Sequence, residues 1–242
     1  MPSVARRALA EFIGTALLLL AVVGSGIAAK RLSPGDTGLE LLENAVATGA
    51  ALAAIIWCLG PVSGSHLNPA VSLVDSALGG LRARHLPAHL GAQLLGGVTG
   101  VVVAKLMFSL PAVTISAHVR SGDGLWLSEA VATFGLLLVI FGLVRSHRPS
   151  AVPVAVGAYI TGAYFFTSST SFANPAVAVA VARMLSNTFA GISPGSVAPF
   201  VAAELAGAAI AFLAIRVLHP AVPAAAPVVV LAGGDAQNQS AG

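Results

Sequence analysis

Charged side chains are scarce in this sequence. Asp, Glu, Lys and Arg make up 9% of its 242 residues, apolar residues make up 57%, and the mean hydropathy is +0.91. A soluble globule of this length needs more polar side chains than that to cover its surface. The composition therefore excludes a soluble globular domain and predicts an integral membrane protein.

Cysteine is almost absent as well. The single residue, Cys58, can form neither a disulfide within the chain nor a thiol-ligated metal site, and its place in an apolar run predicts a packing role. The 12 basic residues give a net charge of +3, but they are spread over short loops and form no patch. We therefore expect no cofactor, no metal and no nucleic-acid partner.

Six apolar stretches are long enough to cross a bilayer, since about 20 helical residues span a hydrocarbon core of ~30 Å. They cover residues 8–29, 41–60, 87–108, 125–145, 151–168 and 197–218. An even number of spans places both termini on one side, and most loop arginines fall on that side, which favours cytoplasmic termini in the cell inner (plasma) membrane. Residues 1–7 then form the cytoplasmic N-terminus, 109–124 a connecting loop, and 219–242 a disordered cytoplasmic tail.

Two short runs share the sequence Asn-Pro-Ala-Val. They are Asn68-Pro69-Ala70-Val71 and Asn174-Pro175-Ala176-Val177. Asn is a favoured N-cap, and Pro is tolerated at the first helical position because the N–H that it lacks would have no partner there. Each motif is therefore predicted to begin a helix at its asparagine.

Both predicted helices are too short to span. Apolar periodicity stops at Gly79-Gly80 in the first and fades near Ser186-Asn187 in the second. Roughly eleven residues at ~1.5 Å each reach about half of the hydrocarbon core. Because unpaired backbone groups are tolerated at membrane depth only beside a water-filled cavity or other protein, the two half-helices predict a polar pathway near the midplane.

The two halves of the chain resemble each other beyond the motif. Residues 10–17 parallel 128–135, and residues 92–97 parallel 203–208. Since each half has three spans, an odd number, the repeat must be inverted in the membrane. The predicted fold is an all-α membrane protein of six transmembrane helices and two re-entrant half-helices, with repeats over 8–108 and 125–218.

The doubled motif in a six-span chain resembles the major intrinsic protein family, the aquaporins and aquaglyceroporins. This resemblance covers roughly residues 8–218. It implies a passive, non-enzymatic channel for water and small neutral solutes, assembled as a homotetramer in the lipid bilayer.

The resemblance also implies a narrow filter of four residues, which are Thr48, Gly162, Ser171 and Val177. The family usually places an arginine after its second motif, where this chain has Val177. Arginine would narrow the pore, donate hydrogen bonds and add a fixed positive charge, and valine does none of these. The expected opening is therefore wide and weakly polar, and it favours larger neutral solutes.

Asn68 and Asn174 are expected to cap their helices through one oxygen and to leave the amide NH₂ free to donate into the pathway. The positive ends of the two half-helix dipoles would meet there and oppose cations and protons. Either asparagine taken alone could equally be a plain N-cap.

Three glutamates, Glu11, Glu129 and Glu204, lie inside apolar spans, where an ionisable group needs partners. The resemblance implies that Glu11 and Glu129 accept backbone N–H groups of the re-entrant loops; a proton relay is the alternative. His66 resembles a loop histidine that helps to line the pore in this family, although a buried structural histidine fits the sequence nearly as well.

Residues 167–177 and 183–189 resemble a bacterial branch of the family associated with arsenic resistance. That resemblance implies neutral metalloid acids or methylated arsenicals as solutes.

Three other functions fit parts of the sequence. A secondary transporter also uses inverted repeats and broken helices, but no ion-coupling constellation is visible. A hydrolase built from Ser63, Ser65 and His66 lacks an orienting acid, and residues so close in one loop rarely reach attack geometry. A non-conducting structural protein is the third alternative.

Overall fold

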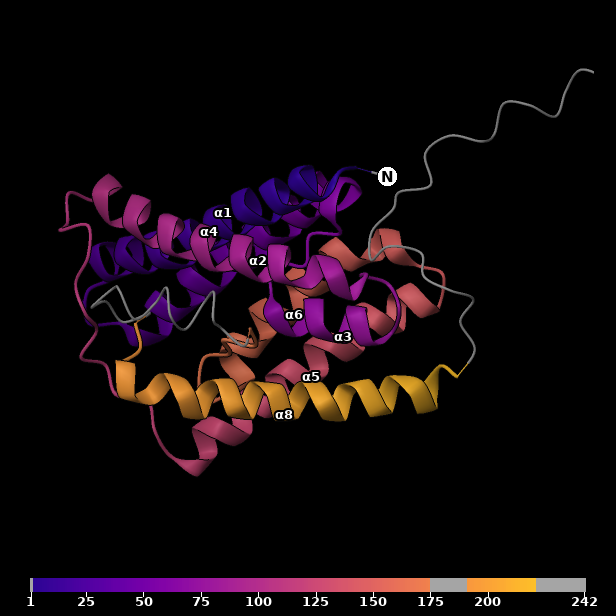
Figure 1. Ribbon diagram of the computed structural model, residues 1–242. Helices are drawn as coiled ribbons and strands as arrows, with labels where there is room; N and C mark the ends of the chain where they lie inside the picture. The colour runs from indigo at the N-terminus through magenta and orange to yellow at the C-terminus, as the bar shows by residue number, and fades with distance from the viewer. Residues whose placement is uncertain (1, 175–190, 221–242) are drawn as a thin grey trace, which may run out of the picture.

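The computed structural model describes residues 2–174 and 191–220, and every regular element in these ranges is a helix (Figure 1). Six helices or helix pairs are long and apolar enough to cross a membrane, which confirms the prediction of six spans. They are α1 (Val4–Leu32), α2 (Thr37–Ser63), α4 (Leu86–Met107), α5 (Asp123–Arg145), α6 (Val152–Phe166) and α8 (Pro194–Leu218). Short 3-10 turns, η1 (Ala83–His85) and η2 (Pro149–Ala151), lead into α4 and α6.

The first two spans are longer than the apolar runs that predicted them. At the start of α1 the side chain of Ser3 accepts the backbone N–H of Arg6 at 3.3 Å, and before α2 the Asp36 carboxylate accepts that of Leu39 at 3.0 Å. Each cap satisfies a helix N–H outside the apolar run, so the helix begins before the hydrophobic residues do.

The short helix α3 (Pro69–Ala77) follows α2 and has nine residues, or about 14 Å of helix at ~1.5 Å per residue. Asn68 caps it, because the Asn68 Oδ1 atom accepts the Ala70 N–H at 2.9 Å. The helix begins inside the bundle and is too short to cross a bilayer, so it is a re-entrant half-helix. The second predicted half-helix, which would begin after Asn174, lies outside the described residues.

The helices make the same contacts in both halves of the chain. Helix α1 packs on α2 and α4, α5 packs on α6 and α8, and α2 meets α6 between the halves. Since α1, α2 and α4 correspond to α5, α6 and α8, this pattern is that of the inverted repeat. The first residues of α1 and the last residues of α8 lie at the same end of the bundle (Figure 1).

Glycines let equivalent helix pairs approach at backbone distance. A Cβ atom at Gly96 of α4 would overlap the Phe12 carbonyl oxygen of α1, and one at Gly207 of α8 would overlap the Ala130 carbonyl oxygen of α5. These two contacts occupy matching places in the repeat. Small residues are what helices in a bilayer require for such close packing.

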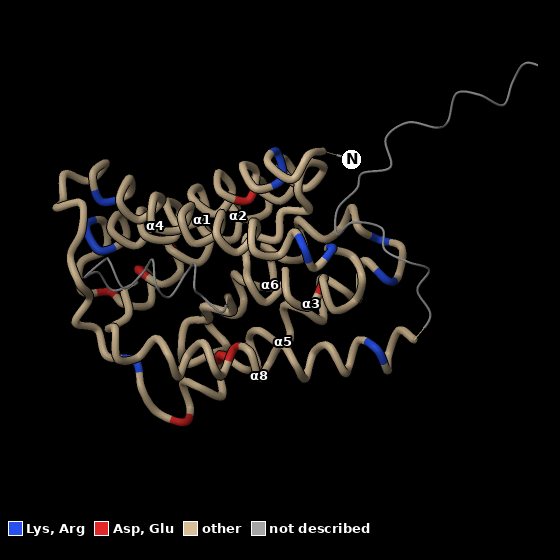
Figure 2. The backbone as a smooth tube through the Cα atoms, in the orientation of Figure 1, with Lys and Arg blue, Asp and Glu red and all other residues tan. Residues whose placement is uncertain are grey.

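Charged residues gather towards the two ends of the bundle, with a few acidic residues between them (Figure 2). Three of the internal acids, Glu11, Glu129 and Glu204, are completely buried. Cys58, by contrast, is exposed, so the predicted packing role is wrong. It lies next to the half-exposed Trp57 on the outer face of α2, and an apolar run in a membrane helix can face lipid as readily as protein.

Candidate functional site

The segments before the two asparagines share an unusual backbone. The third and the first residue before each asparagine adopt positive φ angles without being glycine, and they are Ser65 (45°), Leu67 (51°), Ser171 (47°) and Ala173 (48°). Such a conformation costs roughly 1–2 kcal/mol per residue unless other contacts impose it. The two re-entrant loops are therefore held by their surroundings, and in the same way.

The Glu11 carboxylate holds the first loop. Its Oε1 atom accepts the Ser63 hydroxyl at 2.6 Å and the His66 backbone N–H at 2.9 Å. Its Oε2 atom accepts the Leu67 backbone N–H at 2.7 Å and the Gln93 side-chain amide at 2.8 Å. Four donors from three segments thus converge on one buried carboxylate, and hydrogen bonds to such a group are stronger than neutral ones.

Glu129 holds the second loop in the equivalent manner. Its two oxygens accept the backbone N–H groups of Phe172 and Ala173, each at 2.9 Å. Glu204 adds a third bond, since its Oε1 atom accepts the Asn174 N–H at 3.2 Å. None of the three glutamates lines the cavity described below. Their carboxylates support the loops and do not form a chain along the pathway.

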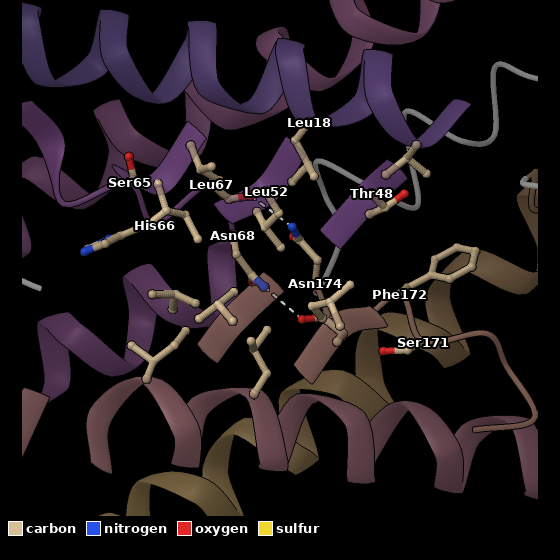
Figure 3. A pocket seen from close by; sticks show the side chains of 18 of the residues that line it. Leu18, Thr48, Leu52, Ser65, His66, Leu67, Asn68, Ser171, Phe172 and Asn174 are labelled. Atoms are coloured by element: carbon tan, nitrogen blue, oxygen red, sulfur yellow. Dashed lines mark hydrogen bonds between the residues drawn. The ribbon is translucent and has the colours of Figure 1, made fainter. Parts of the chain in front are cut away.

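The two asparagines tie the loops to each other (Figure 3). The Asn68 side chain donates to the Ala173 carbonyl at 2.8 Å, and the Asn174 side chain donates to the Leu67 carbonyl at 2.9 Å. We expected both N–H bonds of each side-chain NH₂ group to be free. This is wrong for one of the two, because Asn68 reaches the residue that precedes Asn174, and Asn174 reaches the residue that precedes Asn68. Asn174 Oδ1 has no hydrogen-bond partner among the described residues.

A cavity runs past these asparagines. One part of its lining is polar and comes from the two loops, with Ser65, His66, Asn68, Ser171 and Asn174. The other part is apolar and comes from the long helices, with Leu18, Val22, Leu52, Ile56, Leu136, Ile140, Val152, Val156 and Ile160. The described lining contains no Asp, Glu, Lys or Arg. Such a surface suits a neutral solute that has hydroxyl groups on one side and an apolar face on the other.

His66 both lines the cavity and is anchored. Its Nε2 atom lies 3.3 Å from the Asp75 carboxylate, and its Nδ1 atom lies 3.0 Å from the Ser72 hydroxyl, both on α3. The ring also lies 5.6 Å, centre to centre, from the ring of His89. Because both ring nitrogens are engaged, the edge of the imidazole is fixed against the half-helix.

Thr48, Ser171 and Phe172 lie near one another in the cavity lining (Figure 3), and Tyr164 lines the cavity beside Thr48. The Tyr164 hydroxyl donates to the Thr48 hydroxyl at 3.3 Å, and Tyr164 is 3% exposed. The structure thus brings together two of the four expected filter residues. Val177, with Pro175 and Ala176 of the second motif, lies outside the described residues.

Gly162 is the exception, and its assignment to the filter is wrong. It is exposed, it does not line the cavity, and a Cβ atom there would meet only the exposed ring of Phe166. At ~100° per residue, Gly162 lies about 200° around α6 from Tyr164. Tyr164 therefore lines the cavity in place of Gly162, and it contributes an aromatic ring and a hydroxyl group where no side chain was expected.

A signal for Tyr164 was present in the sequence. Residues at a spacing of four share one face of a helix, and Val152, Val156, Ile160 and Tyr164 form such a row along α6. All four line the cavity. The family resemblance, which implied Gly162, takes no account of how α6 is rotated about its axis.

The described residues thus form six membrane-spanning helices, a re-entrant half-helix and a cavity whose described lining carries no charged side chain, between two loops that bond to each other. These features define a multi-pass membrane channel. Comparison with known proteins identifies it further. Residues 1–209 match the model of the major intrinsic protein family, and the chain belongs to that family. It is a passive channel for water and small neutral solutes, and it is not an enzyme.

Among curated relatives, the aquaglyceroporin AqpS of Rhizobium meliloti is 52% identical over 219 residues, which cover 90% of this chain and 92% of the relative. The aquaporin AqpM of Methanothermobacter marburgensis is 31% identical over 61% of this chain and 69% of its own length. The X-ray structure of the aquaglyceroporin from Plasmodium falciparum has a TM-score of 0.71 at 23% identity and covers 90% of this chain and 98% of its own. That similarity shows the shared fold.

Proposed function

We propose that the channel carries glycerol-like polyols and neutral metalloid acids or methylated arsenicals as well as water. The observation that carries this proposal is the two-sided lining of the cavity, which offers hydroxyl, amide and imidazole groups on one side and aliphatic side chains on the other. A polyol can lay its carbon chain against the aliphatic side and exchange hydrogen bonds with the loops. Water alone would gain nothing from the aliphatic side.

In this proposal the expected filter, with Tyr164 in place of Gly162, forms the outer constriction of the pathway and sets the size limit for solutes. Thr48, Tyr164 and Ser171 supply three hydroxyl groups, and Val177 adds no charge and no donor. Hydroxyl groups both donate and accept, so they can replace part of the hydration of a neutral polyol or a metalloid hydroxide. The name aquaglyceroporin, given to the relative that is 52% identical, agrees with passage of such solutes.

The motif residues are proposed to form the central constriction. Asn68 and Asn174 each keep one side-chain N–H that no described residue accepts, and these two donors would orient the oxygen of a passing solute. Pro69, Ala70, Pro175 and Ala176 would begin the two half-helices, whose positive ends oppose cations there. His66 would add a polar edge to the same pathway.

We also propose that the protein is a homotetramer of the inner (plasma) membrane with both termini in the cytoplasm. The arginines near the two termini favour that orientation. Large apolar side chains exposed along the outside of the helices, such as Leu95, Leu213 and Val217, are available to lipid and to neighbouring copies. Light scattering of the purified protein in detergent, corrected for bound detergent, tests for a mass of four chains.

The solute range is tested by stopped-flow light scattering on proteoliposomes. Vesicles that contain the protein are challenged in turn with sucrose, glycerol, arsenous acid and a methylated arsenical, and empty vesicles give the background rates. We expect the glycerol and arsenous acid rates to exceed the background by about tenfold or more, as a barrier lowered by ~1.4 kcal/mol gives. Water flux without any polyol or metalloid flux would contradict the proposal.

A further inference from the structure

Helices α1 and α4 lie side by side and run in the same direction (Figure 1). Gly96 of α4 packs against the Phe12 carbonyl of α1, and Gly100, one turn further along α4, packs against the Ala16 carbonyl. Because the residue numbers on both sides of the contact rise together, the two helices begin at the same end of the bundle.

Four arginines gather where these two helices begin. Arg6 and Arg7 lie in the first turn of α1, and Arg82 and Arg84 lie at η1, directly before α4. The charges of Arg7, Arg82 and Arg84 all act on the ring of His85. The fold therefore brings arginines from two distant parts of the sequence together.

Acidic groups do not account for this cluster. Arg7 lies one turn from Glu11 and donates to the carbonyl of the last residue of α2 at 3.2 Å, so its charge is partly balanced. Arg6, Arg82 and Arg84 are exposed, and no described carboxylate forms an ion pair with them. The first turns of α1 and α4 contain no acid, and the positive end of the helix dipole lies there, so the helices themselves do not favour these cations.

Each of the two helices continues from its arginine into an exposed row. On α1 the row is Arg6, Leu9, Ile13 and Leu17. On α4 the row is Arg84, Pro87, Gly91 and Leu95. In both rows the spacing is three, four and four residues, which keeps the members on one helix face. Each row is roughly 16 Å long at ~1.5 Å per residue, or about half of a hydrocarbon core of ~30 Å.

We propose that this α1–α4 surface binds an anionic phospholipid. The headgroup phosphate lies against Arg6, Arg82 and Arg84, and the acyl chains lie along the two exposed rows, which match the depth of one leaflet. A guanidinium donates in a fork that fits phosphate oxygens, and basic groups near a membrane surface attract anionic headgroups. A zwitterionic headgroup would bring a further cation to the same arginines. The inference adds a lipid partner to the channel and does not depend on which solutes pass.

The test measures lipid binding to the purified protein in detergent by native mass spectrometry. Phosphatidylglycerol is the anionic probe, and phosphatidylcholine with the same acyl chains is the zwitterionic one. The variant Arg82→Gln with Arg84→Gln removes two exposed charges from the cluster.

Arg148→Gln with Arg216→Gln is the matched control. These two arginines are also exposed, and they lie near the ends of α5 and α8. The end of α5 is tied to the end of α8, because the Arg145 side chain donates to the His219 carbonyl at 2.6 Å. The end of α8 lies at the same end of the bundle as the start of α1 (Figure 1), so the control removes the same charge from that end.

We expect the parent to bind phosphatidylglycerol about tenfold or more tightly than phosphatidylcholine. Arg82→Gln with Arg84→Gln should weaken phosphatidylglycerol binding by about 25-fold, as about fivefold per arginine gives, and the control pair by less than about twofold. Equal losses in the two pairs would mean that the net charge of this end attracts the lipid, and would overturn the proposal. Equal affinity of the parent for the two lipids would overturn it as well.

Two further measurements separate a lipid from a free anion. Inorganic phosphate in about hundredfold excess should leave phosphatidylglycerol bound, and its displacement would mean a general anion site without a lipid. Leu9→Ala with Leu95→Ala shortens both apolar rows without touching an arginine and should weaken both lipids by about threefold or more. Unchanged binding of both lipids in that variant would overturn the placement of the acyl chains. Binding is measured without any flux, so absence of glycerol flux in the parent would overturn the proposed function alone.

Discussion

Replacing Glu11 tests whether one buried carboxylate maintains the first re-entrant loop. In Glu11→Gln one oxygen becomes an NH₂ group that faces two donors, the Leu67 N–H and the Gln93 amide. Gln93 can turn its amide so that its oxygen faces the new NH₂ group, and that oxygen has no other partner among the described residues. The backbone N–H of Leu67 cannot turn away, so this variant leaves one buried donor unsatisfied.

In Glu11→Ala both backbone donors, those of His66 and Leu67, lose their acceptor. An unsatisfied buried donor costs ~1–3 kcal/mol, so we expect a loss of ~1–3 kcal/mol for Gln and ~2–6 kcal/mol for Ala. At ~2–4 °C per kcal/mol for a protein of this size, the midpoint of thermal unfolding should fall by roughly 2–10 °C and roughly 5–20 °C respectively.

The assay is fluorescence-detected gel filtration after heating of the purified protein in detergent. Glu43→Gln is the control, because Glu43 is only partly buried and accepts a single hydroxyl, that of Ser33 at 2.8 Å, which Gln can still accept. It should melt within about 2 °C of the parent. If Glu11→Gln and Glu11→Ala also melt with the parent and lose only solute flux, the carboxylate acts in permeation and the structural account of Glu11 is refuted.

Three further predictions concern Val177, Tyr164 and His118. Val177→Arg should lower glycerol flux about tenfold more than water flux, because a guanidinium narrows the pathway but offers donors to water. An unchanged ratio of the two fluxes would mean that Val177 does not line the constriction. Tyr164→Ala should raise the glycerol-to-water flux ratio about threefold, a barrier change of ~0.7 kcal/mol, whereas Gly162→Ala on the opposite face should not alter it. Partial burial and the charge of Arg120 lower the pKa of His118 below 6.5. Below that pH the unfolded chain binds more protons than the folded chain, so thermal stability should fall as the pH drops through 6.5. His118→Gln removes the titrating group and should lessen that fall.

Much of the scaffold could be predicted because each part depends on short-range chemistry. Apolar runs of about 20 residues give spans wherever they occur. The Asn-Pro pair of Asn68 and Pro69 begins a helix through local capping, and α3 starts at that proline. The family resemblance pointed to Glu11 and Glu129 as partners of the loop backbone, and their carboxylates accept those N–H groups in the structure.

The remaining features depend on long-range geometry. The bonds from Asn68 and Asn174 to the opposite loop join residues more than a hundred positions apart, and no local pattern encodes them. The choice between Gly162 and Tyr164 depends on the rotation of α6 about its axis. Arg120 lies in a segment without periodicity, where only the fold reveals that a charged side chain is buried beside the channel.

Passive passage of neutral solutes through the channel can be tested directly. Radiolabelled glycerol is equilibrated across the membrane of proteoliposomes, and a proton or sodium gradient is then imposed. We predict that the internal concentration stays at the external one, because the described cavity lining contains no carboxylate or ammonium group that could couple an ion to the solute. Accumulation of glycerol above its external concentration, abolished by a protonophore or by removal of sodium, would contradict the channel account.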